Sequence, residues 1–264
     1  MARATAAFFD LDKTIIAKSS TLAFSKPFQA GGLISRGAML RSAYAQFVYL
    51  VGGADHDQME KLRSFMSELT AGWDVATVRE IVADTLQNVV EPLVYDEAVS
   101  LIEEHGLAGR DIVIVSTSGA DVVEPIGELL GADTVVATQM EIVDGKYTGE
   151  ISYYAYGEQK AVAIRELAEQ HGYDLAQCYA YSDSITDVPM LEAVGHPHAV
   201  NPDRDLRKVA TERGWPILVF SRPVALRPRV PLPPTKPTLT ALALGGAALG
   251  GALWWGSRRR VDGA

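Results

Sequence analysis

Short apolar runs alternate with longer segments of helical periodicity along most of the chain. The short runs are rich in Val, Ile, Phe and Tyr, and roughly ten or more residues of helical character separate most of them. This alternation is typical of an α/β fold in which helices cover both faces of a parallel sheet. The expected strands are Ala6–Phe9, Asp111–Val115, Gln177–Tyr181, His198–Asn201 and Ile217–Phe220.

A β-hairpin is expected over residues 139–151. Apolar residues alternate there on both sides of the pair Asp144-Gly145. An Asp-Gly pair fits the two-residue turn of a hairpin, because glycine adopts a positive φ without steric cost.

A helical insert is expected over residues 21–93, where the alternation stops. This stretch is nearly all helical in character, with interruptions at Gly31-Gly32, Gly52-Gly53 and Ala71-Gly72. We expect about three or four helices that form a cap domain. The core domain then comprises residues 1–20 and 94–220.

The C-terminal residues differ in composition from the rest of the chain. Six of the 13 prolines lie between Arg222 and Pro237, which predicts an extended linker over residues 221–237. Residues 238–255 carry no charge, and an apolar helix of that length would span roughly 27 Å, close to a hydrocarbon core of about 30 Å. We expect a transmembrane anchor there, or alternatively an Ala/Gly-rich segment that packs on the body or stays disordered. Gly246 and Gly250 form a G-x-x-x-G pair, a weak indication of a homodimer.

Composition and charge narrow the class of protein. With 264 residues and 48% hydrophobic content, the chain is long enough for a core domain plus a smaller one and too apolar to be disordered. Residues 221–264 hold seven basic residues and one acidic residue, so the preceding 220 residues carry a net charge of −15. A body this acidic is not expected to bind nucleic acid. The single cysteine, Cys178, excludes an internal disulfide, and no charged-then-apolar leader opens the chain, so we expect a cytoplasmic body.

Two carboxylates, Asp10 and Asp12, come directly after the first expected strand. In an extended chain they point to the same side, because side chains alternate with a period of two. Such a pair could hold a divalent cation beside a nucleophilic carboxylate. A D-x-D-x-T pentapeptide taken alone is more often a solvated turn, so its meaning depends on the residues downstream.

Three further groups of polar residues lie downstream. Ser116 ends the second expected strand, where a hydroxyl and backbone N–H groups suit an anion, although an ordinary helix N-cap at Ser118 is the alternative. Lys160 opens a helix, and its alternative is a solvated surface lysine. Asp183 and Asp187 follow a third strand and could both reach one cation, unless one caps a helix and the other is solvated.

The order of these motifs resembles the haloacid dehalogenase superfamily of phosphotransferases, most closely its phosphoserine-phosphatase-like branch. The motifs are D-x-D-x-T, a serine, a lysine and D-x-x-x-D, and the match covers roughly residues 4–220. The resemblance implies a Rossmann-like parallel sheet with an inserted helical cap. The other segments that match this branch are Ser116-Thr117-Ser118-Gly119 through Val122-Val123-Glu124-Pro125, Asp144-Gly145-Lys146-Tyr147-Thr148-Gly149, and Asp187-Val188-Pro189-Met190-Leu191.

The resemblance also implies a role for each motif. Asp10 would attack phosphorus and form an aspartyl-phosphate, and Asp12 would protonate the leaving oxygen and later deprotonate water. The cofactor Mg²⁺ would be held by Asp10, the backbone carbonyl of Asp12 and Asp183, with Asp187 supporting or completing the set. The residues that would bind the phosphate are Thr14, Ser116, Thr117 and Lys160.

Two departures from that branch bear on the substrate. Phosphoserine phosphatases carry a glutamate shortly after the first motif to bind the substrate ammonium, whereas Ala17–Thr21 contains no acid. Phosphoserine is therefore disfavoured, because a dry pocket without a charge partner discriminates against an ammonium group. Ser182 and Thr186 also stand where the branch commonly has glycine and asparagine.

The expected substrate class depends on the insert and the C-terminus. Residues 38–51 contain few polar side chains, so a helix there is either buried in the core of the cap or lines a pocket for an acyl chain. The second interpretation predicts a membrane-anchored phosphatase acting on a lipid phosphate, such as a lysophospholipid or a phosphatidyl phosphate. The alternatives are phosphoserine or another soluble phosphorylated small molecule, and a catalytically silent scaffold or phospho-acceptor. Asp12 argues against the last, since a phospho-acceptor needs no residue that activates water.

Overall fold

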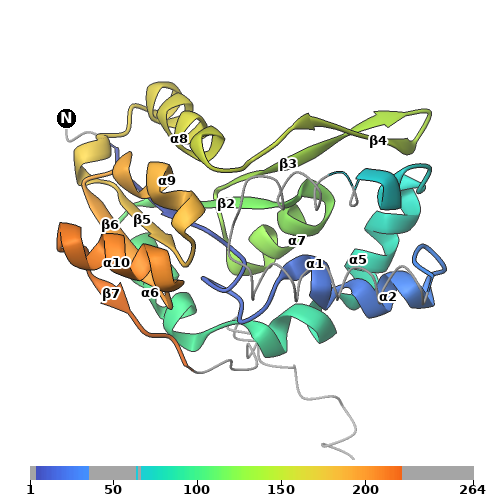
Figure 1. Cartoon of the computed structure of the whole chain (residues 1–264), viewed down its shortest axis with the longest axis horizontal. Coiled ribbons are helices and arrows are strands. Elements are labelled where there is room, and N and C mark those ends of the chain that lie inside the picture. Colours follow the sequence, from blue (N-terminus) through green and yellow to red (C-terminus); the bar gives the residue numbers. More distant parts are fainter. Residues whose placement is uncertain (1–3, 36–63, 65–66, 222–264) are drawn as a thin grey trace, which may run out of the picture. The chain divides into compact units, whose positions relative to one another are not determined.

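A seven-stranded sheet lies at the centre of the residues that the structure describes. The computed structural model of the chain describes residues 4–35, 64 and 67–221, all within one unit, Met1–Leu226. The strand order is β4-β3-β2-β1-β5-β6-β7, and every neighbouring pair is parallel except β3 and β4 (Figure 1). The strands are β1 (Ala6–Phe9), β2 (Asp111–Gly119), β3 (Thr134–Val143), β4 (Lys146–Tyr153), β5 (Tyr179–Ser182), β6 (His196–Val200) and β7 (Ile217–Leu218).

Strand β1 is the point at which the order of the strands reverses. The chain runs outward from β1 through β2, β3 and β4, and then returns to place β5 on the other side of β1. In open α/β sheets, ligands bind beyond the carboxyl ends of the strands at such a switch point. The residues that follow Phe9 therefore occupy the place where a binding site is expected.

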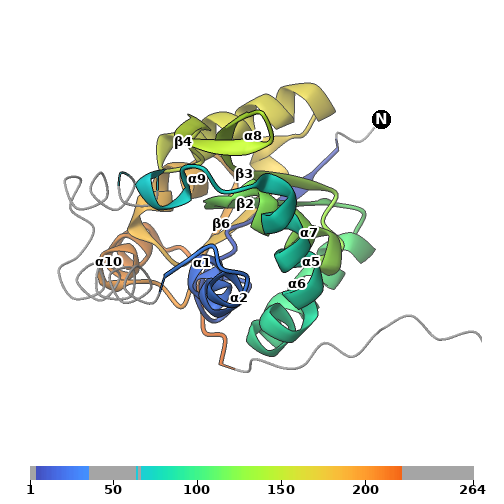
Figure 2. The ribbon, with the colours of Figure 1, turned by 90° about the vertical axis from the view of Figure 1, so that its right-hand side faces the viewer.

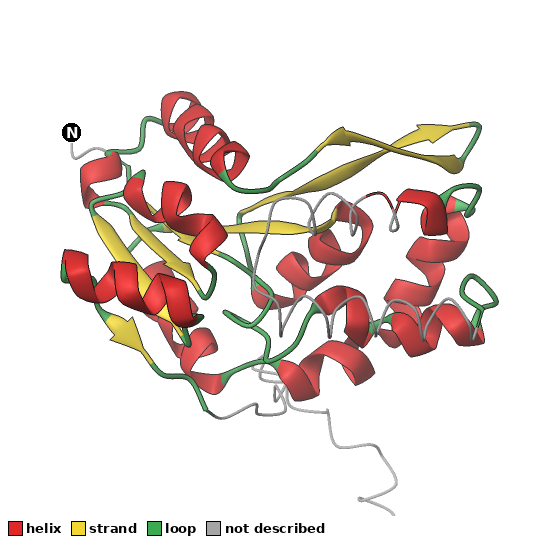
Figure 3. Cartoon of the chain, in the orientation of Figure 1, coloured by secondary structure: helices red, strands yellow, loops and turns green. Residues whose placement is uncertain are grey.

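Alternate side chains of β1 enter two separate cores. Ala6 and Phe8 pack on one face of the sheet and Ala7 and Phe9 on the other, and all four are buried. Helices lie on both faces (Figures 2 and 3), which confirms the predicted α/β fold with a parallel sheet. The helices with buried residues in the first core are α8 (Glu158–His171), α9 (Val188–Glu192) and α10 (Arg204–Arg213). Those in the second are α6 (Asp96–Leu107) and α7 (Ala120–Leu130), together with the insert helices α2 (Ser25–Ala30) and α5 (Val75–Val90).

The predicted strand at Ala6–Phe9 is confirmed, and the bounds of the other strands differ from the prediction. Strand β2 continues to Gly119, and β5 starts late because Leu175–Gln177 forms a 3₁₀-helix. Strand β6 begins before Pro197, a residue that the sequence pattern places outside a strand because proline cannot donate to a ladder. The first half of β3, which pairs in parallel with β2, was not predicted.

The predicted hairpin is confirmed as the pair β3 and β4. Its turn residues Asp144 and Gly145 have φ values of 49° and 75°, and this double positive φ is what a two-residue type I′ turn requires. Backbone hydrogen bonds tie the hairpin to the insert, from Gly72 N to Tyr147 O at 2.8 Å and from Tyr147 N to Trp73 O at 3.0 Å. The hairpin therefore packs on the segment that leads into α5 (Val75–Val90), as Figure 1 shows.

The described part of the insert is mainly helical, with turns at residues 31–35 and 71–74. Its elements are α1 (Ser20–Ala23), α2 (Ser25–Ala30), α5 and the 3₁₀-helix Glu91–Leu93. The two connections between insert and core run side by side, because Ala17 N donates to Leu93 O at 2.8 Å and Tyr95 N donates to Ile15 O at 2.9 Å. The predicted boundaries between core and cap, at residues 20/21 and 93/94, stay predictions.

Several predictions concern residues outside the described part of the chain. These are the apolar helix at residues 38–51, the interruption at Gly52-Gly53, the linker beyond Ser221 and the anchor at residues 238–255. Within residues 4–35, 64 and 67–221, no helix is both long enough and apolar enough to cross a membrane. The anchor and the homodimer indicated by Gly246 and Gly250 therefore remain predictions from the sequence.

Candidate active site

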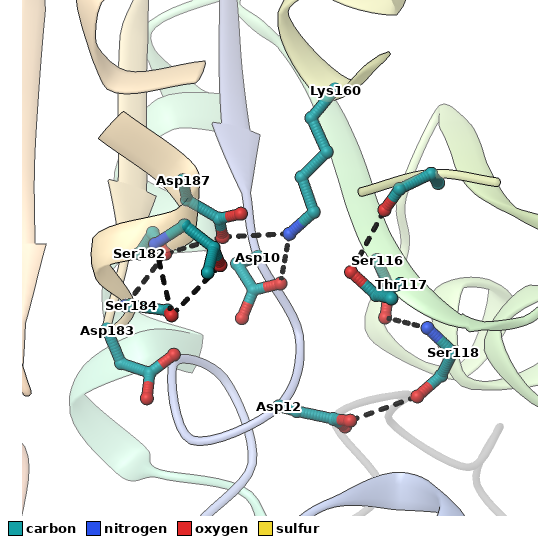
Figure 4. A network of polar contacts seen from close by, with 12 residues as sticks. Asp10, Asp12, Ser116, Thr117, Ser118, Lys160, Ser182, Asp183, Ser184 and Asp187 are labelled. Atoms are coloured by element: carbon teal, nitrogen blue, oxygen red, sulfur yellow. Dashed lines mark hydrogen bonds and ion pairs between the residues drawn. The ribbon is translucent and has the colours of Figure 1, made fainter. Parts of the chain in front are cut away.

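The predicted site residues meet beyond the carboxyl ends of the central strands (Figure 4). Asp10 directly follows β1, and Ser116 lies in the last part of β2. Asp183 directly follows β5, and Lys160 lies in the first turn of α8. The parallel register of β1 with both β2 and β5 aligns these strand ends, so residues far apart in sequence become neighbours.

Lys160 is a buried cation between two carboxylates. It is 1% exposed, and its Nζ donates to Asp10 Oδ1 at 2.7 Å and to Asp187 Oδ2 at 2.8 Å. Burial lowers the pKa of Lys160, but the charges and hydrogen bonds of Asp10 and Asp187 outweigh burial and raise the pKa overall. Lys160 therefore stays charged, and its interpretation as a solvated surface lysine is wrong.

Asp10 is a buried carboxylate whose ionised form Lys160 stabilises only in part. Its side chain is buried, and burial raises its pKa to about 7 against the lowering effect of Lys160. Asp187 and Asp12 add to this rise through their charges. The ionised form of Asp10 therefore requires further positive charge in the site.

Asp183 is a buried carboxylate that forms a long ion pair with Lys13. It is 7% exposed, and the ammonium of Lys13 lies 3.8 Å from its Oδ2. Burial and the charge of Asp10 raise the pKa of Asp183 well above its usual range. Asp187 differs, because its Oδ2 accepts from both Lys160 and Ser182.

The donor set fits a hard divalent cation. Within the described residues, no three side chains of the His, Cys, Asp or Glu type converge on a common point. The set implied by the resemblance is Asp10, Asp183 and the backbone carbonyl of Asp12, with Asp187 supporting or completing it. Because Asp187 Oδ2 already accepts from Lys160 and Ser182, Asp10 and Asp183 are the two side chains left to bind the cation directly. Mg²⁺ commonly binds through one or two carboxylates and keeps several waters, so this set is sufficient for it. A divalent cation would also remove the electrostatic cost that raises the pKa of Asp10 and Asp183.

Asp12 lies on a sharp turn and is held by two serines. Lys13, the next residue, has a φ of 61°, which is uncommon for a residue other than glycine and turns the chain away from the sheet. Asp12 Oδ1 accepts from Ser20 N at 2.8 Å, and Asp12 Oδ2 accepts from Ser118 Oγ at 3.0 Å. Burial raises the pKa of Asp12, and the N–H of Ser20 counters this effect in part.

The three polar residues expected to bind phosphate have different surroundings. Thr14 is 1% exposed, and its Oγ1 has no hydrogen-bond partner among the residues the structure describes. Ser116 Oγ accepts from Ser118 N at 3.2 Å and keeps its own proton to donate. Thr117 Oγ1 donates its proton to Ala155 O at 2.9 Å, so this proton is already used in a hydrogen bond within the protein.

Sequence reasoning missed three serines of this network. The alternative interpretation of Ser118 as a helix cap is wrong, because Gly119 is the N-cap of α7 and Ser118 Oγ turns to Asp12. Ser20 and Ser182 are fully buried and contact Asp12 and Asp187, respectively. A signal for Ser182 was available in the sequence, since a serine that ends a buried apolar strand requires a polar partner.

Comparison with known proteins places this geometry in a family. Residues 7–192 match the family described as haloacid dehalogenase-like hydrolase. The chain is 66% identical to the inhibition of morphological differentiation protein of Streptomyces azureus, over 98% of this chain and 95% of that protein. It is 61% identical to a probable phosphatase of Mycobacterium tuberculosis, over 97% and 90%. It is 34% identical to the phosphoserine phosphatase SerB1 of the same organism, over 94% and 78%.

Solved structures share the fold. A Bordetella pertussis protein of unknown function matches 82% of this chain and 99% of its own, with a TM-score of 0.71 and 29% identity. A phospho-aspartyl intermediate analogue of phosphoserine phosphatase matches 84% and 95%, with a TM-score of 0.62 and 19% identity. At that identity the second match shows the fold alone. Taken together, the family match over residues 7–192 and the relatives above 60% identity show that the chain belongs to the haloacid dehalogenase-like hydrolases.

Proposed function

We propose that this phosphatase hydrolyses phosphate monoesters of small, water-soluble alcohols, with Mg²⁺, through an aspartyl-phosphate on Asp10. The observation that carries the proposal is the buried ammonium of Lys160, 2.7 Å from Asp10 and 2.8 Å from Asp187. This ammonium holds one oxygen of Asp10 and leaves the other oxygen for attack. Asp12, two residues further on, is held separately by hydrogen-bond donors and can serve as the acid and base.

The first half of the reaction transfers the phosphoryl group to the enzyme. A carboxylate oxygen of Asp10 forms a bond to phosphorus while the bond from phosphorus to the ester oxygen breaks. The carboxylic acid of Asp12 gives its proton to the departing oxygen, so that the alcohol leaves neutral. The raised pKa of Asp12 favours the protonated form that this step requires.

The second half returns the enzyme to its starting state. A water molecule attacks phosphorus, and the carboxylate of Asp12 takes one of its protons. The bond from phosphorus to Asp10 breaks, inorganic phosphate leaves, and Asp10 is again a carboxylate. In this proposal, Lys160 and the hydroxyls of Ser116 and Thr14 stabilise the charge on the phosphoryl oxygens in both halves, and the burial of all three residues supports this role.

Asp10, Asp183 and the carbonyl of Asp12 are the residues that would hold Mg²⁺. Bound there, the cation would neutralise charge on the phosphoryl group and on the nucleophile. Both carboxylates have raised pKa values, which is the behaviour expected of ligands that require a cation to ionise.

The proposed substrate class draws on the relatives and on the start of the insert. Ser19 and Ser20 stand in the stretch Ala17–Thr21 that lacks an acid, and the backbone N–H of Ser20 is already used by Asp12. This neighbourhood offers no charge partner for an ammonium, so we place phosphoserine below phosphate esters without an amino group. One relative is named a phosphoserine phosphatase, and phosphoserine therefore remains the first alternative to test.

A lipid phosphate is the second alternative substrate. That prediction depends on the apolar residues 38–51 and 238–255, which lie outside the described residues. The silent scaffold is the alternative of another class, and the hydrogen-bonded placement of Asp12 disfavours it, because a scaffold has no use for a second positioned carboxylate.

The test is hydrolysis of p-nitrophenyl phosphate by the full-length protein in detergent, with Mg²⁺ and after chelation. We expect Mg²⁺-dependent release of nitrophenol that Asp10→Asn abolishes. Asp84→Asn, an exposed aspartate on α5, is the matched control and should keep the wild-type rate. No release by folded wild-type protein, or equal release by Asp10→Asn, would contradict the mechanism. A panel of glycerol phosphate, phosphoserine and lysophosphatidate in vesicles then separates the substrate classes.

A further inference from the structure

We infer that Ser118 and Ser20 are positioning residues that hold the carboxylate of Asp12 for proton transfer. The inference rests on the proposed function, because Asp12 is the acid and base of that mechanism. Each oxygen of Asp12 has its own donor: Oδ1 accepts from the backbone N–H of Ser20 at 2.8 Å, and Oδ2 accepts from the hydroxyl of Ser118 at 3.0 Å. Figure 4 shows Ser118 turned toward Asp12.

A third hydrogen bond fixes the direction of the network. Ser20 Oγ donates to Ser118 Oγ at 2.8 Å. A hydroxyl has one proton to donate, so Ser118 accepts from Ser20 and gives its own proton to Asp12. Hydrogen bonds to an ionised carboxylate are about twice as strong as neutral ones, so both donors favour this orientation of Asp12.

The contacts that Ser20 and Ser118 make with Asp12 and with each other are not helix caps. The N-cap of α1 is Ser19, and the N-cap of α7 is Gly119. The bond between the hydroxyls of Ser20 and Ser118 joins residues 98 positions apart, and Ser20 is 0% exposed. Tertiary packing brings the two hydroxyls together, and the relay from Ser20 through Ser118 ends on the carboxylate of Asp12.

The network also connects α1, the helix at the boundary between core and insert, with the central sheet. Ser20 is the first residue of α1, and Ser118 lies in β2. Asp12 keeps this orientation only while the first turn of α1 lies against the end of β2. The placement of the insert therefore determines whether Asp12 is correctly oriented to give and take a proton.

The experiment compares two substrates that differ in their need for an acid. Phenyl phosphate and p-nitrophenyl phosphate differ by one nitro group, and the phenol oxygen is the more basic leaving group, so it depends more on protonation. The value of kcat/KM reports the steps through the departure of the alcohol. We expect Ser118→Ala to lower kcat/KM for phenyl phosphate about tenfold and to lower it much less for p-nitrophenyl phosphate. Ser20→Ala should act in the same direction. Ser118→Thr keeps the hydroxyl, so the ratio of kcat/KM for p-nitrophenyl phosphate to kcat/KM for phenyl phosphate should return to the wild-type value.

Two controls make the result specific. Asp12→Asn gives the change in ratio that follows from complete loss of the acid, and Ser100→Ala, which removes an exposed serine on α6, should leave the ratio unchanged. The double variant Ser20→Ala/Ser118→Ala should lose about as much as Ser118→Ala alone, because the two hydroxyls act as one unit.

The outcomes separate the inference from the proposed function. If the wild type hydrolyses both esters and Ser118→Ala lowers both equally, Ser118 has a structural or phosphate-binding role and the inference is overturned. Additive losses in the double variant would also contradict it. If folded wild-type protein hydrolyses neither ester, the proposed function fails for these substrates and the inference fails with it.

Discussion

The hydroxyl of Ser182 donates a hydrogen bond of 2.7 Å to Oδ2 of Asp187. The same oxygen accepts from Lys160 at 2.8 Å, and Lys160 also donates to Asp10 at 2.7 Å. Ser182 is 0% exposed and Asp187 is 2% exposed, so these contacts form in the absence of bulk water. A line of hydrogen bonds thus runs from the end of β5 to the proposed nucleophile. Ser182, which departs from the family pattern, contacts Asp187 through this bond.

Ser182→Ala should weaken both stability and turnover. A hydrogen bond to a charged group contributes about 1.5–3 kcal/mol, so the free energy of unfolding should fall by about that amount in a denaturant titration. Asp187 would hold Lys160 less firmly, and we expect kcat for p-nitrophenyl phosphate to fall several-fold while KM changes little. Ser152→Ala removes an exposed serine from β4 and is the matched control. Unchanged kcat in a Ser182→Ala protein would show that Lys160 does not depend on this bond.

The effect of Asp183→Asn on the melting temperature should depend on Mg²⁺. The raised pKa of Asp183 comes from burial and from the charge of Asp10, so its ionised form is unfavourable in the absence of a cation. Without Mg²⁺, we therefore expect the variant to melt at the same or a higher temperature than the wild type. With Mg²⁺, the wild type should gain a melting-temperature increase that the variant lacks, because binding to the native state alone stabilises it.

The same measurement contains its own control. Asp203 lies close to Asp183, and its Oδ2 accepts from Ile185 N at 2.8 Å. Asp203→Asn keeps one oxygen to cap α10 but loses the acceptor of Ile185 N. This variant should lose stability under both conditions yet keep the increase caused by Mg²⁺. An equal Mg²⁺ response in the wild type and in Asp183→Asn would remove Asp183 from the set of ligands.

The sequence predicted the parts of the site that depend on strand ends. Asp10, Ser116 and Asp183 each come at or directly after an apolar run, and parallel strands align their carboxyl ends. The sequence alone therefore predicts that these three residues lie close together. Lys160 could be placed only through its motif, since its burial depends on the packing of α8 against the sheet.

The hydroxyl network could not be predicted in the same way. Ser20 contacts Ser118 across 98 positions of sequence, and the partner of a hydroxyl is decided by packing rather than by any periodicity. The strand β6 was placed too late for a different reason. Pro197 cannot donate a backbone hydrogen bond, and prolines are uncommon inside strands. The sequence pattern therefore predicted a strand that begins at His198, whereas β6 begins at His196.

Asp12→Asn should trap the covalent intermediate. An amide cannot take a proton from water, so the second half of the reaction stops. The first half continues with p-nitrophenyl phosphate, whose leaving group needs little protonation. We expect a burst of about one nitrophenol per enzyme, followed by slow turnover, which is the kinetic sign of an accumulating intermediate. Intact-protein mass spectrometry should show one added phosphoryl group.

The matching variant for the trapping experiment is Asp10→Asn/Asp12→Asn. It lacks the nucleophile and should show neither burst nor added mass. A burst that survives in this double variant would place the phosphoryl group on another residue. Steady turnover by Asp12→Asn at the wild-type rate would contradict the role of Asp12.

A buried histidine outside the site should give the fold a dependence on acid. His105, near the end of α6, is 4% exposed, and its Nε2 lies 2.8 Å from the hydroxyl of Tyr181. Its Nδ1 lies 3.3 Å from a guanidinium nitrogen of Arg110, which can only donate, so Nδ1 accepts and Nε2 carries the proton. Burial, with smaller contributions from the charges of Arg110 and His198, lowers the pKa of His105 from 6.5 to about 4. The neutral imidazole is therefore the form that fits the fold.

The direction of the pH effect follows from this lowered pKa. Between about pH 6.5 and pH 4 the unfolded chain binds a proton at His105 and the folded chain does not, so acid favours unfolding. The contribution of the neutral imidazole is complete above pH 6.5 and is lost as the pH falls toward 4. By linkage, His105 should account for about 2 kcal/mol of the stability lost between pH 7 and about pH 5.

His105→Gln should reduce the pH dependence of denaturant unfolding by that amount. His171→Gln, a substitution at an exposed position of α8, should leave the pH dependence as it is in the wild type. Equal pH dependence in the wild type and in His105→Gln would mean that the imidazole is protonated within the folded protein.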